Sequence, residues 1–214
     1  MTDNESLSLV NKVFSEILEA HNILELKNVL DSNSVESKFR MSSDFYPRLN
    51  IRISSNEIVH LKEKKLLDKD FSLNYEEISK TTDPLVKLLY AALWKNRDVF
   101  KVKHIANGVC HDLPANVENE RALVFYNFGK HLNPGGSFPI VDQHVLRAYS
   151  VYTDYGNVQK YRKQNLVNDR NIISKYVDWI RSAFKKELME DVDYMYHIDQ
   201  TLFAVGKKIK SPKK

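Results

Sequence analysis

The chain has 214 residues, which is long enough for one good-sized core, and a formal net charge of +4. Hydrophobic residues make up 43% and charged residues 28%, an ordinary composition for a globular protein. The absence of a run of about 18 apolar residues argues against a membrane span, and the acidic start MTDNESLSLV does not fit a signal peptide. Its single cysteine, Cys110, excludes an internal disulfide and a four-thiolate iron–sulfur cluster. A reducing compartment is therefore expected, cytoplasmic or with the nucleoid or nucleus.

The positive charge is unevenly distributed along the chain. Residues 91–163 carry ten basic and six acidic side chains. Residues 207–214 carry five lysines and no acid, a composition typical of a solvated, frayed end. We therefore expect a single domain over residues 1–206, followed by a basic flexible tail. The internal basic segment is the better candidate for binding a polyanion.

The first part of the chain mixes helical and extended patterns. Apolar residues at three- and four-residue spacing predict one or two helices over 7–30. The alternating segment RLNIRIS predicts a strand at 48–54, with FSLNY at 71–75 as its candidate partner. With only six glycines and six prolines, the chain favours long helices, so we expect a mainly α fold with at most this small β ribbon.

From Tyr75 onward the pattern is helical almost throughout. Asp83 and Pro84 form a typical helix start, with the acid as N-cap and the proline in the first turn. The following segment, PLVKLLYAALWKN, is apolar on nearly all sides, which predicts a buried helix. Further helices are expected over 75–80, 97–110, 118–132, 143–152, 166–189 and 192–205.

The segment FPIVDQHVLRAY, residues 138–149, contains the first candidate for chemistry. Asp142 follows an extended apolar tripeptide and precedes a helical pattern, so its side chain is expected to cap that helix. His144 and Arg147 lie near the same helix end. Asp142 is either a cap alone, or a cap that is also the acid of an active site.

Lys130 is the second candidate, at the end of the preceding helix and 12 residues before Asp142. A lysine at this position can simply complement a helix C-terminus. Alternatively, the loop NPGGS folds the two helices back on each other, and the amine and the carboxylate share a cleft suited to Schiff-base chemistry.

Aromatic side chains cluster around the basic segment, among them Tyr126, Phe128 and Tyr149. Most tyrosines are expected at the edge of the core, and a minority could stack on a nucleobase. His104, Cys110 and His111 lack a fourth ligand at zinc spacing, and no glycine-rich phosphate loop is present. We therefore expect neither a metal site nor a cofactor.

The segment IVDQHVLRAY resembles the VDxHVxR segment of the helix–hairpin–helix DNA glycosylases, the group of endonuclease III and 8-oxoguanine DNA glycosylase. The preceding FYNFGKHLNP supplies a lysine-bearing helix and a short loop, as in the compact, divergent 8-oxoguanine-glycosylase-like proteins. The resemblance spans residues 113–152 and implies a core of this type over about 83–206. By position it implies Asp142 as the essential acid and Lys130 as the nucleophile.

This resemblance implies a protein that binds duplex DNA, extrudes a damaged base such as an oxidised purine, and cuts its glycosidic bond. A lysine Schiff base would add an AP-lyase step. The implied substrate contacts come from Tyr126, Phe128, His144, Arg147 and Tyr149. The implied DNA-backbone contacts come from Asn116, Val117 and Lys103. A monomer is expected.

The hairpin departs from the family pattern and leaves other interpretations open. The sequence LPANV, residues 113–117, stands where the family has LPGVG, whose backbone amides bind phosphate. Without these glycines the chain could be a helical DNA-binding or protein-interaction module that lacks the chemistry. A third interpretation is a stand-alone helical protein in which Asp142 is only a cap.

Overall fold

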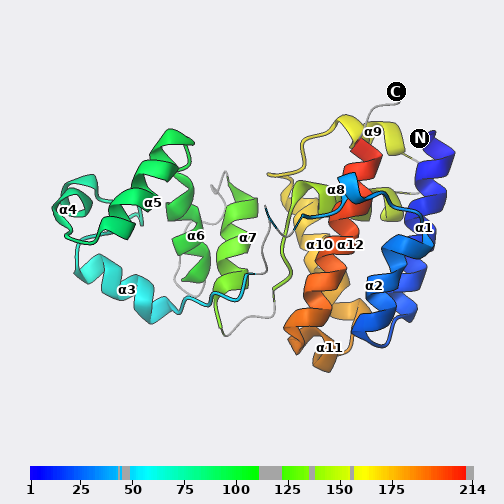
Figure 1. The fold of residues 1–214 in the computed structure, drawn as a ribbon, viewed down its shortest axis with the longest axis horizontal. Coiled ribbons are helices and arrows are strands. Elements are labelled where there is room, and N and C mark those ends of the chain that lie inside the picture. The colour runs from blue at the N-terminus through cyan, green and yellow to red at the C-terminus, as the bar shows by residue number, and fades with distance from the viewer. Residues whose placement is uncertain (43, 45–48, 111–121, 135–137, 155–156, 211–214) are drawn as a thin grey trace. The chain divides into compact units, whose positions relative to one another are not determined.

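A computed structural model of the chain describes residues 1–42, 44, 49–110, 122–134, 138–154 and 157–210. Over these residues the fold is all-α, with twelve α-helices, one short 3-10 turn and no strand (Figure 1). In the same part of the chain, no helix is long and apolar enough to cross a membrane. The chain forms two compact units, which we name the terminal unit (Met1–Leu49 with Pro139–Lys214) and the central unit (Asn50–Phe138). The expectation of a single domain stays a prediction.

The terminal unit is a helical bundle around α12. Its elements are α1 (Asp3–Glu19), α2 (Ile23–Ser32), the 3-10 turn η1 (Ser37–Phe39), α8 (Gln143–Thr153), α9 (Val158–Lys163), α10 (Arg170–Ala183), α11 (Lys186–Glu190) and α12 (Val192–Lys210). Helix α12 packs along α8 and α2, and α1 lies against α8 (Figure 1). Gly206 permits the close approach of α12 to α8, because a Cβ atom at this position would overlap the carbonyl oxygen of His144.

Of the one or two helices predicted over 7–30, two form, α1 and α2. The stripe Val10, Val13, Phe14 and Ile17 is fully buried, as its spacing predicts. The side chain of Asn22 accepts the N–H of Glu25 and thereby starts α2 as a separate helix.

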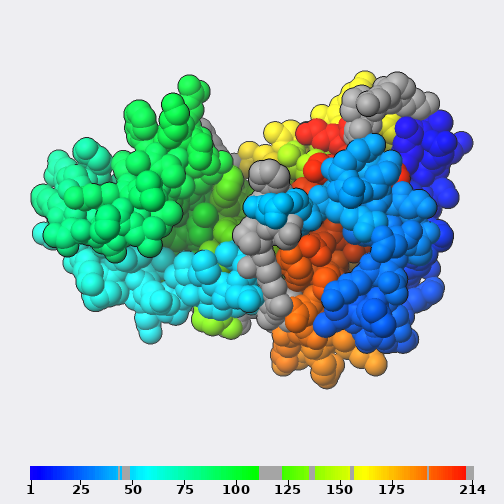
Figure 2. Space-filling model, in the orientation of Figure 1, coloured from blue at the N-terminus to red at the C-terminus, as the bar shows by residue number. Residues whose placement is uncertain are grey.

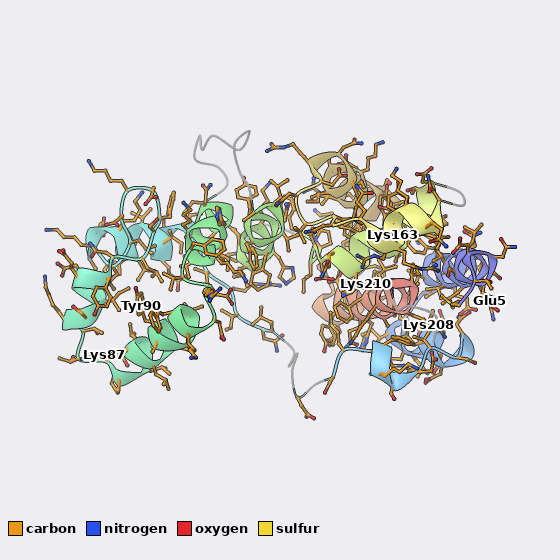
Figure 3. The ribbon with its side chains drawn as sticks, turned by 90° about the horizontal axis from the view of Figure 1, so that it is seen from above. Glu5, Lys87, Tyr90, Lys163, Lys208 and Lys210 are labelled. Atoms are coloured by element: carbon orange, nitrogen blue, oxygen red, sulfur yellow. The ribbon has the colours of Figure 1, made fainter. Side chains whose placement is uncertain are left out.

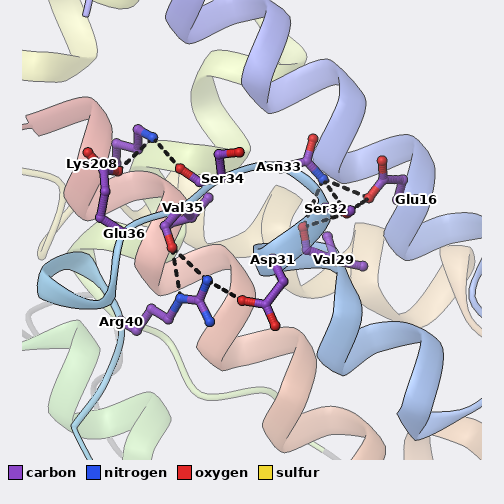
Figure 4. A network of polar contacts seen from close by, with 10 residues as sticks. All are labelled: Glu16, Val29, Asp31, Ser32, Asn33, Ser34, Val35, Glu36, Arg40 and Lys208. Atoms are coloured by element: carbon purple, nitrogen blue, oxygen red, sulfur yellow. Dashed lines mark hydrogen bonds and ion pairs between the residues drawn. The ribbon is translucent and has the colours of Figure 1, made fainter.

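The segment that follows α2 is fastened by charged side chains (Figure 4). Lys208 of α12 donates to the carbonyl oxygen of Ser34 at 3.1 Å and pairs with Glu36 at 2.7 Å. The hydrogen bond from Lys208 is the main reason that the pKa of Glu36 falls to about 2. Arg40 pairs with Asp31 at 2.6 Å, so both ends of this short segment are held to helices.

The prediction of a flexible tail over 207–214 is wrong for its first four residues. Residues 207–210 complete the last turn of α12. They remain helical because Ile209 is fully buried and Lys208 pairs with Glu36. Residues 211–214 lie outside the described residues.

The central unit contains five helices in its described part. They are α3 (Ser55–Glu63), α4 (Tyr75–Lys80), α5 (Pro84–Lys95), α6 (Lys101–Val109) and α7 (Leu123–Leu132). Helices α6 and α7 pack with two glycines at their contact. A Cβ atom at Gly108 would overlap the carbonyl oxygen of Tyr126, and one at Gly129 would overlap that of Ile105. The two helices therefore meet backbone to backbone.

The strand expected over 48–54 does not form in the described part of that segment. Instead of pairing with another strand, Ile53 donates its backbone N–H to the carbonyl oxygen of Leu132, the last residue of α7, at 3.0 Å. The expected partner segment makes one isolated bridge, between Leu67 and Leu73. The alternating pattern therefore belongs to an extended connection that is bound to a helix end.

Helix α5 begins as predicted, but its predicted burial is wrong. The carboxylate of Asp83 accepts the backbone N–H groups of Leu85 and Val86. No side chain of α5 is buried in the described chain, and Leu85, Leu88 and Leu89 are 59%, 66% and 56% exposed. Figure 2 shows this segment, in green, at the surface. An exposed apolar face of this kind is typical of an interaction surface.

Two further helices are shorter than predicted. The helix expected over 166–189 is divided, because Phe184 is extended and separates α10 from α11. The helix expected over 97–110 starts later, because Arg97 adopts a left-handed backbone with φ 60° and α6 begins at Lys101.

Candidate functional site

Asp142 is the N-cap of α8, as the sequence predicts. Its Oδ1 accepts the backbone N–H of His144 at 2.6 Å. The carboxylate therefore lies at the positive end of the helix dipole, where a negative charge is stabilised. Because Asp142 is only partly buried, the fold holds this carboxylate in a fixed position and leaves part of it accessible.

Arg147 fixes the tautomer of the neighbouring histidine. Its guanidinium is buried, at 1% exposure, and its Nη1 donates to Nδ1 of His144 at 3.0 Å. Since arginine can only donate, Nδ1 is the acceptor and a neutral His144 carries its proton on Nε2. Burial lowers the pKa of His144 below its ordinary value, Asp142 opposes this shift, and Arg147 adds to it. These surroundings therefore favour the neutral imidazole of His144.

The remaining donors of Arg147 bind backbone carbonyl groups. Nε donates to Tyr161 at 2.8 Å and Nη2 donates to Gln164 at 3.4 Å, both at the C-terminal end of α9. Carbonyl groups at a helix C-terminus are suited to a cation. The geometry thus gives Arg147 a positioning role between α8 and α9, and its substrate contact stays a prediction.

A second carboxyl group near Asp142 was not predicted from the sequence. Asp199 of α12 is 2% exposed, and burial raises its pKa well above the usual range. The backbone N–H of Ile140 donates to this carboxyl group and lowers its pKa in part, whereas the charge of Asp142 raises it. The nearby hydroxyl of Tyr176 also lowers the pKa of Asp199, although within the described chain neither that hydroxyl nor Oδ1 of Asp199 has a hydrogen-bond partner of good geometry. This site favours the neutral, protonated form of Asp199.

One signal for Asp199 was present in the sequence. Met195, Ile198 and Leu202 form part of the buried face of α12. Asp199 stands four residues after Met195 and three before Leu202, which places a carboxyl group on an apolar helix face. Acidic residues are rarely buried on an apolar helix face, so the position indicates a site.

The two carboxyl groups differ in environment, and this difference has chemical consequences. Asp142 lies at a helix N-terminus that stabilises its charge, and Asp199 is enclosed in the bundle, where ionisation is costly. Paired carboxyl groups in contrasting environments can divide two tasks between them, one stabilising positive charge and the other supplying a proton. The start of α8 is therefore the candidate functional site.

Lys130 lies on α7, in the central unit. Its Nζ lies 4.9 Å from the ring centroid of Tyr126 and 5.0 Å from that of Phe138. These cation–π contacts favour a charged ammonium group, whereas nucleophilic attack needs the free amine. Asp142 belongs to the terminal unit, and the pairing of the two residues across the loop stays a prediction.

The predicted aromatic contacts are largely core residues. Tyr126 and Tyr149 are 3% and 6% exposed, and the hydroxyl of Tyr149 donates to the carbonyl oxygen of Lys175 at 3.0 Å. Phe128 is partly exposed and stacks on His131, with 6.3 Å between ring centroids. Their stacking on a base stays a prediction.

The predicted DNA-backbone residues are divided between described and undescribed parts of the chain. Lys103 lies partly exposed on α6. Asn116 and Val117 lie outside the described residues.

Metal-ligating side chains are not grouped in the described chain. No cluster of three or more His, Cys, Asp or Glu residues there could hold a metal ion. Cys110 is buried, and burial raises the pKa of its thiol, which disfavours the reactive thiolate.

Comparison with known proteins returns no match for this chain: no protein-family model fits the sequence, and no curated protein or solved structure is significantly similar to it.

Proposed function

We propose that the chain is a DNA glycosylase that removes a damaged base, of the oxidised-purine class, from duplex DNA. The observation that carries this proposal is the pair of carboxyl groups at the start of α8, one held at a helix N-terminus and the other buried. The resemblance of VDQHVLR to the glycosylase segment adds support, because it assigns the essential acid to Asp142. Cofactors and metals are not required for this chemistry.

In this proposal the carboxyl groups act at opposite sides of the bond that breaks. Cleavage of the glycosidic bond leaves positive charge on the sugar, and the ionised Asp142 stabilises that charge. The departing base takes the bonding electrons and needs a proton. The protonated form of Asp199 is the chemical type that supplies one.

Lys130 is the proposed nucleophile, by its position in the resemblance. Its free amine forms a bond to C1′ while the bond from C1′ to the base breaks, and the nitrogen then loses a proton. Opening of the sugar ring gives a Schiff base, from which strand cleavage can follow. Because aromatic contacts favour the ammonium form, substrate binding has to change the surroundings of Nζ.

Basic side chains of the terminal unit are proposed to bind the DNA phosphates. The charges of Lys210 and Lys207 contribute to the lowered pKa of His144, so both lysines act at the start of α8. Figure 3 shows Lys163 and Lys210 on α9 and α12, which pack against each other. The compartment that fits a DNA substrate and the free thiol of Cys110 is reducing, either the cytoplasm or the nucleoid or nucleus.

Borohydride trapping on duplex oligonucleotides tests this function. We expect a covalent adduct on an oligonucleotide that carries 8-oxoguanine or an abasic site, and its loss in Lys130→Gln. Base release should fail in Asp142→Asn, although asparagine caps helices about as well as aspartate and should keep the fold. Lys95→Gln, at an exposed lysine of α5, is the matched control and should behave as the wild type. If no lesion is processed and no adduct forms, the enzyme proposal is wrong.

A non-catalytic helical module is the second candidate. The exposed apolar face of α5 favours it, because such faces usually bind a partner. Duplex DNA binding that weakens steeply with salt but releases no base would favour this module over the enzyme.

A further inference from the structure

A cavity of about 490 Å³ lies in the central unit, between the end of α5, the start of α6 and the turn that precedes α4. Its lining combines aromatic rings with cations. The aromatic lining residues are Trp94 and Phe100, and the basic ones are Arg97 and Lys103. Ser72 and Leu73 line the cavity from the turn before α4. None of them takes part in bond cleavage in the proposed glycosylase, and only Lys103 was an implied DNA-backbone contact.

The first wall of the cavity is fixed by the way in which α5 ends. The N–H of Arg97 donates to the carbonyl oxygen of Trp94 at 3.0 Å, and that of Asp98 donates to Leu93 at 2.8 Å. Glycine usually occupies the left-handed position of this capping motif. Here Arg97 occupies it, with φ 60°, and both Arg97 and Trp94 line the cavity.

The opposite wall is also a tight turn. Left-handed non-glycine residues of the described chain are Ser34, Lys65, Phe71 and Arg97. One of the four, Arg97, lines the cavity, and Phe71 directly precedes Ser72, which also lines it. The N–H of Phe71 donates to the carbonyl oxygen of Asp68 at 3.0 Å, and Nζ of Lys62 lies 4.1 Å from its ring centroid. Both walls are therefore preorganised by backbone hydrogen bonds.

The lining chemistry matches a flat aromatic group that carries a negative charge. Trp94 and Phe100 are 68% and 56% exposed, although large aromatic rings are usually buried. Arg97 and Lys103 stand beside them. The charge of Lys103 is partly balanced by Asp70, which also holds Ser72 through two hydrogen bonds. Aromatic rings beside basic groups are the combination that stacks nucleobases and binds their phosphates.

We propose that this cavity binds one nucleotide, with its base stacked on Trp94 and Phe100 and its phosphate bound by Arg97 and Lys103. The nucleotide is either free or one unit of a single strand. The phosphate contact that the sequence predicts for Lys103 is thereby assigned to this cavity. All of these residues lie in the central unit, and the inference concerns nucleotide binding without any bond cleavage. It therefore does not depend on the proposed glycosylase activity.

The exposed leucines of α5 do not form part of this site. Trp94 follows Leu85 by nine residues, about two and a half helical turns, so the two side chains project from opposite sides of the helix. Tyr90 lies on the Trp94 side and contacts Tyr75, with 5.6 Å between ring centroids. Figure 3 shows Tyr90 and Lys87 on this helix. An apolar protein partner would use the leucine side, so its binding can be told apart from nucleotide binding.

Titration of the full-length protein with thymidine 5′-monophosphate and with a labelled oligothymidine of about ten nucleotides tests the inference. We expect stacking to quench tryptophan emission. Trp94→Ala should weaken binding by about tenfold or more, and Trp94→Phe should keep most of it. Arg97→Gly and Lys103→Gln should also weaken binding. Glycine suits the left-handed position, so unfolding would not explain a loss in Arg97→Gly.

Lys95→Gln is the matched control, because Lys95 is an exposed lysine of α5 that does not line the cavity. Equal affinity for the monophosphate and for the strand would assign the free nucleotide, and strand binding alone would assign single-stranded nucleic acid. Binding that is indifferent to Trp94→Ala and Arg97→Gly, or lost equally in Lys95→Gln, overturns the inference. Binding that is lost only in Leu88→Glu also overturns it. Asp142→Asn should bind nucleotide normally, so failure of the glycosylase proposal would leave this result unchanged.

Discussion

Asp199 is a carboxyl group that the terminal unit encloses at 2% exposure, near the charge of Asp142. Ionisation of a buried acid is costly, so the fold favours a proton on this residue. A protein that needed only an apolar core would place leucine or alanine here. The polar residue is better explained by the site at the start of α8 than by packing.

The proton on Asp199 should make stability depend on pH. In the unfolded chain an aspartate titrates near pH 3.9. In the folded protein the pKa of Asp199 is raised, so the folded state binds more protons above that pH, and the free energy of unfolding falls as the pH rises toward the folded pKa. Asp199→Asn has no titrating carboxyl group at this position, so its free energy of unfolding should not fall in this way. Relative to the wild type, it should gain about 1.4 kcal/mol between pH 4 and pH 7 for each pH unit by which folding raises the pKa of Asp199.

Urea unfolding at a series of pH values checks this prediction. Asp178→Asn, at an exposed acid of α10, is the matched control. A constant difference between Asp199→Asn and the wild type over this range would show that Asp199 is ionised in the folded protein.

Arg97 illustrates a residue kept at a cost to backbone stability. Left-handed backbone is unfavourable for residues with a side chain, by about 1 kcal/mol or more. Arg97→Gly should therefore raise the free energy of unfolding by about 1 kcal/mol, and Lys65→Gly, at the same left-handed position after α3, should do likewise. Chemical denaturation measures both. Only Arg97→Gly should weaken nucleotide binding, and a loss of stability in either variant would contradict the expected relief of strain.

At the scale of helices, close backbone contact joins α8 to α12. Alanine is a better helix former than glycine by about 1 kcal/mol. Gly206→Ala should nevertheless lower the free energy of unfolding by about 1–3 kcal/mol, because the new Cβ would overlap the carbonyl oxygen of His144. Thermal and urea unfolding measure the change. Ser15→Ala, at an exposed position of α1, should alter stability by less than about 0.5 kcal/mol. A gain in stability for Gly206→Ala would mean that the two helices are further apart.

Helix α5 gives a contrasting prediction. Leu88→Glu should change the free energy of unfolding by no more than about 0.5 kcal/mol, since Leu88 is 66% exposed. Leu202→Ala, at a fully buried leucine of α12, should cost about 2–5 kcal/mol. Urea unfolding of both variants provides the comparison. A loss of several kcal/mol in Leu88→Glu would show that this face is buried in solution, for example against a second copy of the chain.

Local patterns predicted helix starts well. Asp83 and Asp142 were identified as caps because capping depends on one side chain and the next few backbone N–H groups, all of which are adjacent in sequence. The sequence predicts correctly that α5 is a helix, but the predicted burial of α5 is wrong, because burial depends on which elements pack against a helix. The alternating segment at 48–54 likewise bonds to the end of α7, a contact that its own residues do not specify.

The candidate site was only partly predictable for the same reason. Asp142 has a local signature. The environment of Asp199 is set by Ile140 and Tyr176, which are far from it in sequence and contact it only in the folded terminal unit. The nucleotide cavity joins Ser72 to Trp94 and Lys103, and only the fold of the central unit brings these together.

At the scale of the whole molecule, charge limits how the protein can bind nucleic acid. The central unit carries 13 basic and 11 acidic residues, and the net charge of the whole chain is +4. Such a balance gives weak long-range attraction to a polyanion. Affinity for DNA must therefore come from local groups of lysines and arginines.

The salt dependence of duplex DNA binding tests this distribution. Each phosphate contact steepens the slope of log K against log salt by about 0.9. If Lys163, Lys207 and Lys210 each contact one phosphate, the triple Gln variant should lose about 2.7 of that slope and bind duplex DNA weakly at every salt concentration. A triple Gln variant of Lys12 on α1, Lys27 on α2 and Lys64 at the C-cap of α3, all exposed, has the same net charge as the first triple variant and should retain the wild-type slope. Equal loss in both triple variants would mean that binding follows net charge alone, and no DNA path over α9 and α12 would then be supported.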